Sequence, residues 1–245
     1  MKKFLKGFFK TILAMTLVFC LFLVGVVAFV AESAEEFFAF RKDNVIEYFL
    51  NREDGISHLE MVKCVYTAYV TTIEAANKYP DNPMLEDAYK HYTWNYESTR
   101  LIGAEKTKLI TDNHEMALSI RGRVDETYDS FLNEFEKEEG FLKLVAMPKA
   151  MIATINILPS IRSGVVADSR NADPCSVRDY YSSATIMDFY NNEVGRGDSL
   201  AYPDVSRSDA FKMRSSSNTI VLTYENLNDM YNDYTLDYVR NKICY

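Results

Sequence analysis

The sequence has few of the residues and none of the short motifs that mark common catalytic or cofactor sites. It contains three histidines and no Cys-x-x-Cys pair, so no standard zinc-ligand pattern occurs. His114-Glu115 begins like the zinc-binding helix of metalloproteases, but Leu118 stands where the second histidine would have to be. A Gly-x-Ser-x-Gly elbow and a glycine-rich phosphate loop are also missing. We therefore predict no catalytic residue, no metal ligand and no cofactor, and we do not expect an enzyme.

Glycine and proline, which interrupt helices, are also scarce: the 245 residues include nine glycines and six prolines. Long segments between them repeat apolar residues every three or four positions, which is the period of an α-helix. Seventeen tyrosines and fifteen phenylalanines supply bulky side chains for packing. We predict an all-α protein in which an N-terminal transmembrane helix precedes an exported antiparallel helical bundle with a long C-terminal loop and a final helix.

Charge is absent from residues 11–31, a run of 21 residues that follows a basic segment, residues 1–10. A helix of that length spans about 31 Å, which matches the hydrocarbon core of a bilayer of about 30 Å. A secretory signal has a shorter apolar core of about 7–15 residues and small residues at its cleavage site. Glutamates lie at or beside the best candidate cleavage sites, near Ala31 and Ala34. We predict that residues 11–31 are kept as a membrane anchor; the alternative is cleavage and secretion of a soluble effector.

The four lysines of residues 1–10 are expected to stay in the cytoplasm, so residues 32–245 lie on the periplasmic or extracellular side. No Asn-x-Ser/Thr glycosylation acceptor occurs in the chain, which favours a bacterial cell envelope. Asp and Glu number 35 against 27 Lys and Arg. An acidic exported part repels nucleic acid and anionic lipid headgroups, so we expect no nucleic acid and favour a basic protein partner. A homo-oligomer is the other partnership that we consider.

Four cysteines occur, and Cys20 lies inside the predicted anchor. The other three are an odd number for an oxidising compartment, so one of them has no partner within the chain. Cys64 falls on an apolar helical stretch, and we predict that it is a buried free thiol. Cys175 lies in a loop-like stretch and Cys244 next to the last residue, and we predict a disulfide between these two.

Two capping patterns mark where helices begin after the anchor helix, which we expect to extend to about residue 50. Ser57 and Glu60 form a capping box, and the helix that they open ends before Pro80. Asn82 followed by proline begins the next helix. That helix runs to about residue 139.

The second of these helices is either unbroken or interrupted between Gly103 and Asn113. Both helices carry an apolar seam at coiled-coil spacing, and such a seam must pack against another helix. We predict that residues 32–164 form the helical bundle. Tyrosines on the seams could alternatively line an internal pocket for a small ligand, which would make the bundle a sensor. The seams are Leu59, Val62, Tyr66, Tyr69, Ile73 and Ala76 on the first helix, and Leu85, Tyr89, Tyr92, Tyr96, Thr99, Ile110, Ala117, Ile120, Val124 and Phe131 on the second.

Residues 140–164 are apolar enough to raise the alternative of a second membrane span. Lys143, Lys149 and Asn156 lie within the stretch, and a lysine near the centre of a span costs roughly 2.5–3.5 kcal/mol on insertion scales. Pro148 would bend a helix there. We therefore favour a buried, proline-kinked core helix or a helical hairpin.

We assign residues 165–245 to a C-terminal helical unit that packs on the bundle. Residues 165–175 are loop-like, and Ser176 can cap a helix that ends near Glu193. Residues 194–217 show no helical period, so we predict a long loop there.

The predicted loop contains Arg196-Gly197-Asp198, the adhesion tripeptide of integrin ligands. We attribute the tripeptide to chance, because so short a motif carries little specificity. Gly195 and Gly197 are more simply explained as residues of a turn.

The last predicted helix begins near residue 220, runs almost to the C-terminus and places four carboxylates in one row beside a tyrosine seam. Side chains four positions apart lie on the same face of a helix, and like charges at this spacing destabilise it by roughly 0.2–0.5 kcal/mol per pair. The row is either a solvated face or a docking strip for a basic partner or a loosely held divalent cation. Its residues are Glu225, Asp229, Asp233 and Asp237.

Together these features predict a single-pass membrane protein whose exported helical bundle acts as a protein-interaction, scaffold or assembly module of the cell envelope. This prediction depends on the anchor, the helical seams, the acidic surface and the missing catalytic motifs. A ligand-binding, sensor-like bundle and a secreted effector are the alternatives.

Overall fold

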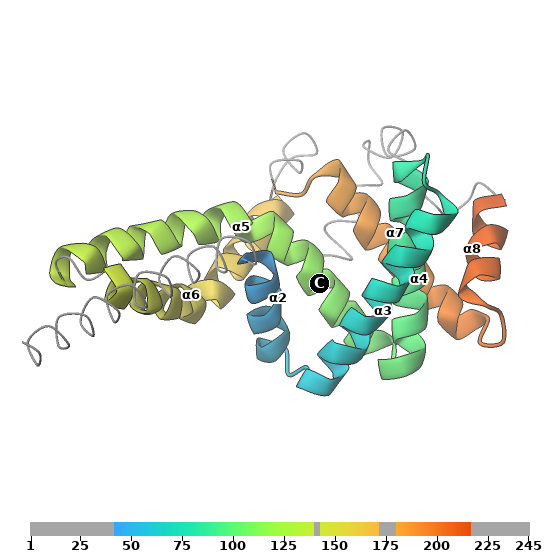
Figure 1. The fold of residues 1–245 in the computed structure, drawn as a ribbon, viewed down its shortest axis with the longest axis horizontal. Helices are drawn as coiled ribbons and strands as arrows, with labels where there is room; N and C mark the ends of the chain where they lie inside the picture. Colours follow the sequence, from blue (N-terminus) through green and yellow to red (C-terminus); the bar gives the residue numbers. More distant parts are fainter. Residues whose placement is uncertain (1–41, 140–142, 172–179, 217–245) are drawn as a thin grey trace, which may run out of the picture. The chain divides into compact units, whose positions relative to one another are not determined.

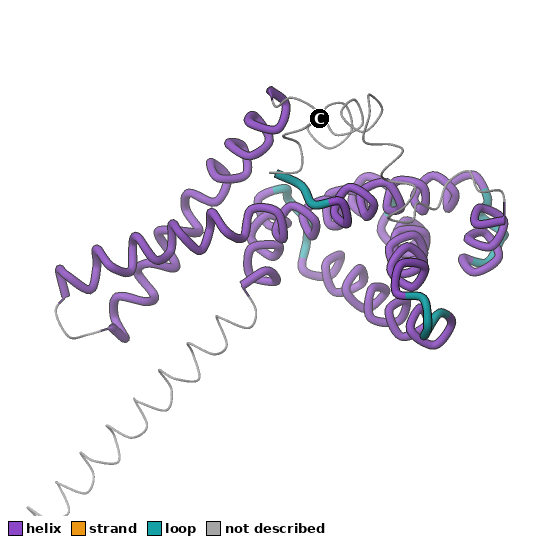
Figure 2. Tube along the Cα trace, turned by 90° about the horizontal axis from the view of Figure 1, so that it is seen from above, coloured by secondary structure: helices purple, strands orange, loops and turns teal. Residues whose placement is uncertain are grey.

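The computed structural model describes residues 42–139, 143–171 and 180–216, which contain helices and no strand (Figures 1 and 2). The all-α prediction is confirmed for this part of the chain. The predicted anchor, the predicted disulfide of Cys175 with Cys244 and the acidic row of the last helix lie outside the described residues. The helices are α2 (Lys42–Glu53), α3 (His58–Lys78), α4 (Pro83–Ile102), α5 (Ala104–Glu139), α6 (Lys143–Asn171), α7 (Ser183–Ala201) and α8 (Arg207–Ser216).

Two of these helices begin at the caps that the sequence predicts. The Ser57 hydroxyl accepts the N–H of Glu60, and the Glu60 carboxylate accepts the N–H of Ser57 at 2.9 Å, so the capping box of α3 is complete. Asn82 Oδ1 accepts the N–H of Leu85 at 3.1 Å, and Pro83 is the first residue of α4. Both predicted helix starts are confirmed.

Gly103 separates α4 from α5 and settles the alternative that the sequence leaves open. Its φ is +87°, a left-handed conformation that glycine adopts without steric cost. Its N–H still donates to the carbonyl of Thr99 at 2.9 Å, while its own carbonyl accepts the N–H of Thr107 at 3.1 Å. One helix therefore ends and another begins at this single residue.

Helix α4 packs against α3, α5, α7 and α8, and its tyrosine seam is buried. Tyr89, Tyr92 and Tyr96 are inaccessible to solvent, and the ring centroids of Tyr89 and Phe211 of α8 lie 4.8 Å apart. The part of the predicted seam that belongs to α4 therefore lies in the hydrophobic core. A second apolar cluster joins α2, α5, α6 and α7 through Ile46, Leu50, Met116, Ile120, Leu158, Val165, Ile186 and Met187.

Helix α3 corrects the sequence analysis, because its predicted seam faces solvent. Leu59, Val62, Tyr66, Tyr69 and Ile73 are 45–67% exposed. The helix instead packs its opposite, narrower side against α4. The residues of α3 on this narrow side are Met61, Cys64, Thr67, Thr71 and Ala75.

Two contacts explain why the narrow side of α3 can be buried. The threonine hydroxyls of α3 donate to carbonyls four residues earlier, as Thr67 does to Lys63 at 2.8 Å, so their burial leaves no hydroxyl unpaired. Trp94 of α4 donates its indole N–H to the carbonyl of Cys64 at 2.9 Å. Cys64 is buried and free, which confirms the prediction for this thiol.

Helix α6 is continuous through Pro148 and Pro159, so of the two favoured alternatives, a single core helix and a helical hairpin, the hairpin is wrong. The predicted loop is also wrong for residues 165–171, which are helical. Helix α6 lies beside α5 (Figure 1). Its Arg162 forms an ion pair with Asp54, which follows α2, with Nη1 2.9 Å from Oδ2. Its residues Ala146–Asn171 are long and apolar enough to cross a membrane, and 22% of their most apolar stretch is buried. The membrane-span alternative stays a prediction.

The predicted long loop at residues 194–217 is mostly helical, which is a second correction. Helix α7 continues to Ala201, and α8 follows after a short turn. Gly195 and Gly197 are therefore helical and mark no turn. Arg196 and Asp198 are buried, so the tripeptide is not displayed.

At Gly195 the backbone of α7 lies close against the backbone of α4, closer than any other described glycine lies to a neighbouring segment. A Cβ atom at Gly195 would overlap the backbone carbonyl of Tyr92, whereas one at Gly197 would meet nothing within 4 Å. The same helix pair is tied by Asp198, which accepts from the Tyr92 hydroxyl and from Arg214 Nε of α8, each at 2.7 Å. A glycine that looks like a helix breaker in the sequence is thus required for helix packing.

We predict opposite effects of the same substitution at these two glycines. Gly195→Ala should lower the free energy of unfolding by about 1–3 kcal/mol, because the added methyl group forces α7 away from α4. Gly197→Ala, on the exposed side of the same helix, should leave it unchanged or raise it by up to about 1 kcal/mol through helix propensity. Urea unfolding of the full-length protein, followed by circular dichroism, measures both values. Equal effects would contradict the close α4–α7 contact.

Candidate metal centre

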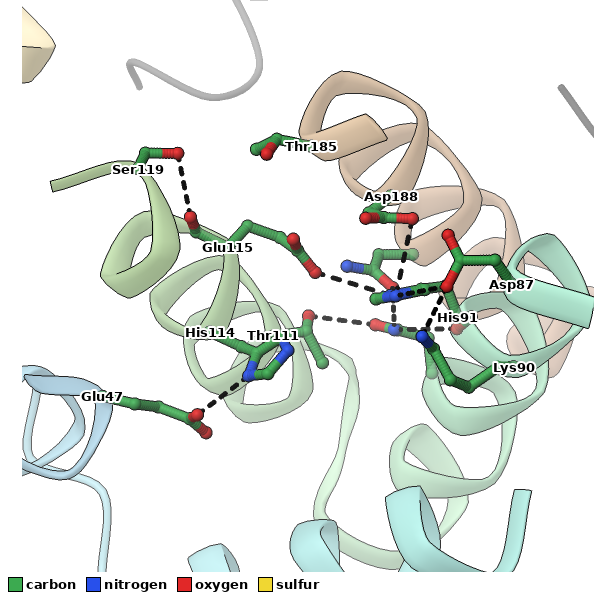
Figure 3. A network of polar contacts seen from close by, with 12 residues as sticks. Glu47, Asp87, Lys90, His91, Thr111, His114, Glu115, Ser119, Thr185 and Asp188 are labelled. Atoms are coloured by element: carbon green, nitrogen blue, oxygen red, sulfur yellow. Dashed lines mark hydrogen bonds and ion pairs between the residues drawn. The ribbon is translucent and has the colours of Figure 1, made fainter. Parts of the chain in front are cut away.

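Polar side chains gather in the interior where α4, α5 and α7 meet (Figure 3). Each helix contributes two residues spaced four positions apart, which places both on the same face. The pairs are Asp87 and His91 on α4, Thr111 and Glu115 on α5, and Asp188 and Asn192 on α7.

The imidazole of His91 lies in the middle of this cluster. Its Nε2 atom is 3.4 Å from Asp188 Oδ1 and 3.7 Å from Asp87 Oδ1. On the other side of the ring, Nδ1 is 3.4 Å from Glu115 Oε1 and 3.3 Å from Asn192 Oδ1. Two carboxylates thus lie at one nitrogen, and a carboxylate and an amide lie at the other, as Figure 3 shows for the carboxylates.

Burial keeps His91 uncharged. The imidazole is 3% exposed, and its burial, together with the positive charge of Lys90, lowers its pKa to about 3. At neutral pH one ring nitrogen therefore has a free lone pair. With the proton on Nδ1, where Asn192 Oδ1 accepts it, the lone pair of Nε2 lies toward Asp87 and Asp188.

Burial also changes the carboxyl groups of Glu115 and Asp188. It raises the pKa of each well above its ordinary value, and the negative charge of the neighbouring carboxylates raises both further. Asp87 differs: burial acts on its pKa in the same direction, but positive charge on His91 or Lys90 lowers it. Because His91 is neutral, Lys90 is the group that supplies this charge at neutral pH. Lys90 forms an ion pair with Asp87.

The cluster would have more negative charge than its own residues neutralise if its three carboxyl groups were all ionised. With all three carboxyl groups ionised, Lys90 balances one charge and neutral His91 none, which leaves two negative charges. Asp188 Oδ1 and both oxygens of Glu115 have no hydrogen-bond partner among the described residues, although Asp188 is 7% and Glu115 0% exposed. Unpaired buried charges cost several kcal/mol. The cluster therefore has to take up protons or a divalent cation.

The geometry fits a metal ion. One ligand atom from each of Asp87, His91 and Asp188 lies within 4.8 Å of the other two. Ligands at about 2.1 Å from a tetrahedral ion lie about 3.4 Å from one another, which is close to the two distances from Nε2. The groups at Nδ1 match the outer shell of metal-bound histidines, in which a carboxylate or an amide oxygen orients the ring.

Further hydrogen bonds hold this outer shell in place. Asn95 of α4 donates to Asn192 Oδ1, and Asn95 Oδ1 accepts from Thr111 Oγ1 at 3.0 Å and from Arg196 at 2.9 Å. His114, in contrast, turns to Glu47 of α2, with Nδ1 2.9 Å from Oε2. His114 therefore lies near the cluster without belonging to the ligand set.

The residues of this cluster were not predicted from the sequence. In the sequence, Glu115 stands out only as part of an incomplete protease motif, and a pair of carboxylates has no specificity in a chain with 35 of them. The signal that could have found them is a polar pair at i and i+4 on each of three helices. That signal becomes specific only when the fold places Asp87 beside Asp188, 101 positions later in the chain.

In comparisons with known proteins, no family model matches this chain, and no curated protein and no solved structure resembles it significantly. A function for the cluster therefore has to be derived from its own physical chemistry.

We predict that the charge on Glu115 destabilises the metal-free protein in a pH-dependent way. A carboxyl group whose pKa is raised by folding stabilises the native state below its unfolded pKa of about 4.3, and this contribution is lost as the pH rises through the folded pKa. In chelator, wild type and Glu115→Gln should be about equally stable near pH 4. At pH 8 the variant should be more stable by about 1–3 kcal/mol.

Urea unfolding at several pH values in chelator measures this difference. Glu126→Gln, which changes an exposed carboxylate on the same helix, is the control and should follow the wild type at every pH. A pH-independent difference between wild type and Glu115→Gln would contradict a buried, uncompensated carboxylate.

Proposed function

We propose that this protein binds a divalent transition-metal ion through Asp87, His91 and Asp188. The observation that carries the proposal is a buried histidine with two carboxylates at its Nε2 atom, one of which, Asp188, has an oxygen without a hydrogen-bond partner among the described residues. A divalent cation would neutralise the two surplus charges of the cluster. It would also give the unpaired oxygen a ligand bond.

The donor set indicates the class of metal. One imidazole nitrogen and two carboxylate oxygens suit zinc, manganese or ferrous iron, whereas calcium and magnesium prefer oxygen ligands alone. Three protein ligands leave at least one coordination position for water or another small ligand. Glu115 lies on the far side of the ring, so its role is to orient His91 and to strengthen it as a ligand.

This proposal favours the ligand-binding alternative, with a metal ion as the ligand. The ion would join α4 to α7 directly, and Glu115 of α5 would be linked to it through His91. Metal binding would therefore change the stability of the helical unit, which is a property that a sensor or a metal-dependent assembly module requires.

The cellular compartment in which the metal centre would lie is proposed from the sequence. Residues 11–31 would anchor the protein in the membrane, and residues 32–245 would form an exported antiparallel bundle in the cell envelope. The role of scaffold for a protein partner is a second candidate function. The exposed side of α3 supports that role.

The test is metal titration of the chelator-treated full-length protein, with Zn²⁺ and Mn²⁺ as probes. Calorimetry should give one ion per chain, and an ion concentration of 100 times Kd should stabilise the fold by about 2.7 kcal/mol. His91→Gln and Asp188→Asn should each weaken binding by at least about 100-fold. Asp188→Asn keeps the size of the side chain and removes one buried charge, so we expect it to fold.

The matched control is His114→Gln, because His114 lies next to the cluster but bonds to Glu47. This variant should keep the wild-type affinity. Equal affinity in His91→Gln and wild type, or equal stabilisation of all four proteins by the ion, would contradict the proposed centre.

A further inference from the structure

The exposed side of α3 forms a continuous apolar surface, which we call the α3 face. Its side chains are 45–67% exposed, and none of them is charged. Single exposed apolar residues are common on proteins, but contiguous apolar patches mark interaction sites. The α3 face consists of Leu59, Val62, Val65, Tyr66, Tyr69 and Ile73.

The spacing within the α3 face is that of a helix–helix seam. Leu59, Val62, Tyr66, Tyr69 and Ile73 follow one another at intervals of three and four residues, which is the a and d pattern of a coiled coil. From Leu59 to Ile73 this seam extends about 21 Å along the helix. A seam of this length fits another helix of similar length.

We propose that the α3 face is the interface between two copies of this chain, with α3 of one copy packed on α3 of the other. A two-fold interface uses the same patch twice, so the patch must be complementary to itself. A neutral, apolar seam meets this condition. The chain has a net charge of −8, so its acidic surfaces would repel the same surfaces of a second copy. Lys63 lies beside the seam, and its charge is positive, so it does not add to the negative charge of the chain.

The size of the α3 face also fits a dimer. Side chains of these types, at these exposures, offer on the order of 600 Å² in each copy. Two copies would then bury about 1,200 Å², which is the lower end of the range of specific protein interfaces. The Cys64 side of α3 is already packed on α4, so dimer formation would bury both sides of the helix.

The first test is the mass of the full-length protein in detergent, measured by light scattering after gel filtration. The wild type should have the mass of a dimer, and Tyr66→Glu combined with Tyr69→Glu should raise the dissociation constant at least about tenfold. Leu200→Glu is the control, because Leu200 is 66% exposed on α7 and lies outside the α3 face. It should remain a dimer. A monomeric wild type, or a dimer that the two glutamates leave intact, would overturn the proposal.

The second test identifies what covers the α3 face. Tyr66→p-benzoylphenylalanine places a photoreactive group on it, and the cross-linked product is identified by mass spectrometry. A product of two chains joined near α3 supports the dimer. A cross-link within one chain to residues 217–245, or to lipid alone, would overturn it and would identify that segment or the bilayer as the occupant.

Discussion

The arrangement of α4, α5 and α7 depends on a neutral histidine enclosed by carboxylates. His91 has carboxylate oxygens 3.4–3.7 Å away on both sides of its ring, and burial prevents it from carrying the charge that would balance them. A protein interior does not keep such a cluster without compensation, because uncompensated charges oppose folding by several kcal/mol. Protons or a metal ion must therefore be bound whenever these three helices are packed together. The choice between them determines how stable the protein is at a given pH and metal concentration.

The rest of the described fold positions this cluster. Gly195 lets α7 approach the backbone of α4 at Tyr92, and Asp198 fixes that approach through Tyr92 and Arg214. One helical turn away, the same approach brings Asn192 to His91 and to Asn95. A change of packing at Gly195 would therefore move the outer shell of the candidate metal centre. Local packing and the chemistry of the site are linked through a single pair of helices.

Features that depend on neighbouring residues could be predicted from the sequence, and features that depend on distant ones could not. The caps at Ser57 and Asn82 act within three residues, so their patterns predict both helix starts. Cys64 is buried as predicted, but it lies on the side of α3 opposite the apolar seam. Gly195 reads as a turn residue, because nothing in the local sequence shows that another helix backbone lies against it. The exposure of the larger apolar seam of α3 could not be predicted for a similar reason. The opposite side of the helix, with its threonines and small residues, is the side that packs on α4. The metal cluster combines three ordinary i and i+4 pairs, and only the fold brings them together.

The presence of a metal ion at His91 is tested most directly by anomalous diffraction from crystals of the protein prepared with Zn²⁺ or Mn²⁺. We expect one anomalous peak beside Nε2 of His91, with carboxylate oxygens of Asp87 and Asp188 at about 2.0–2.2 Å from it and Glu115 on the Nδ1 side of the ring. Density without an anomalous peak at His91, in crystals that contain the metal elsewhere, would contradict the proposal. It would show that protons alone compensate the buried carboxylates.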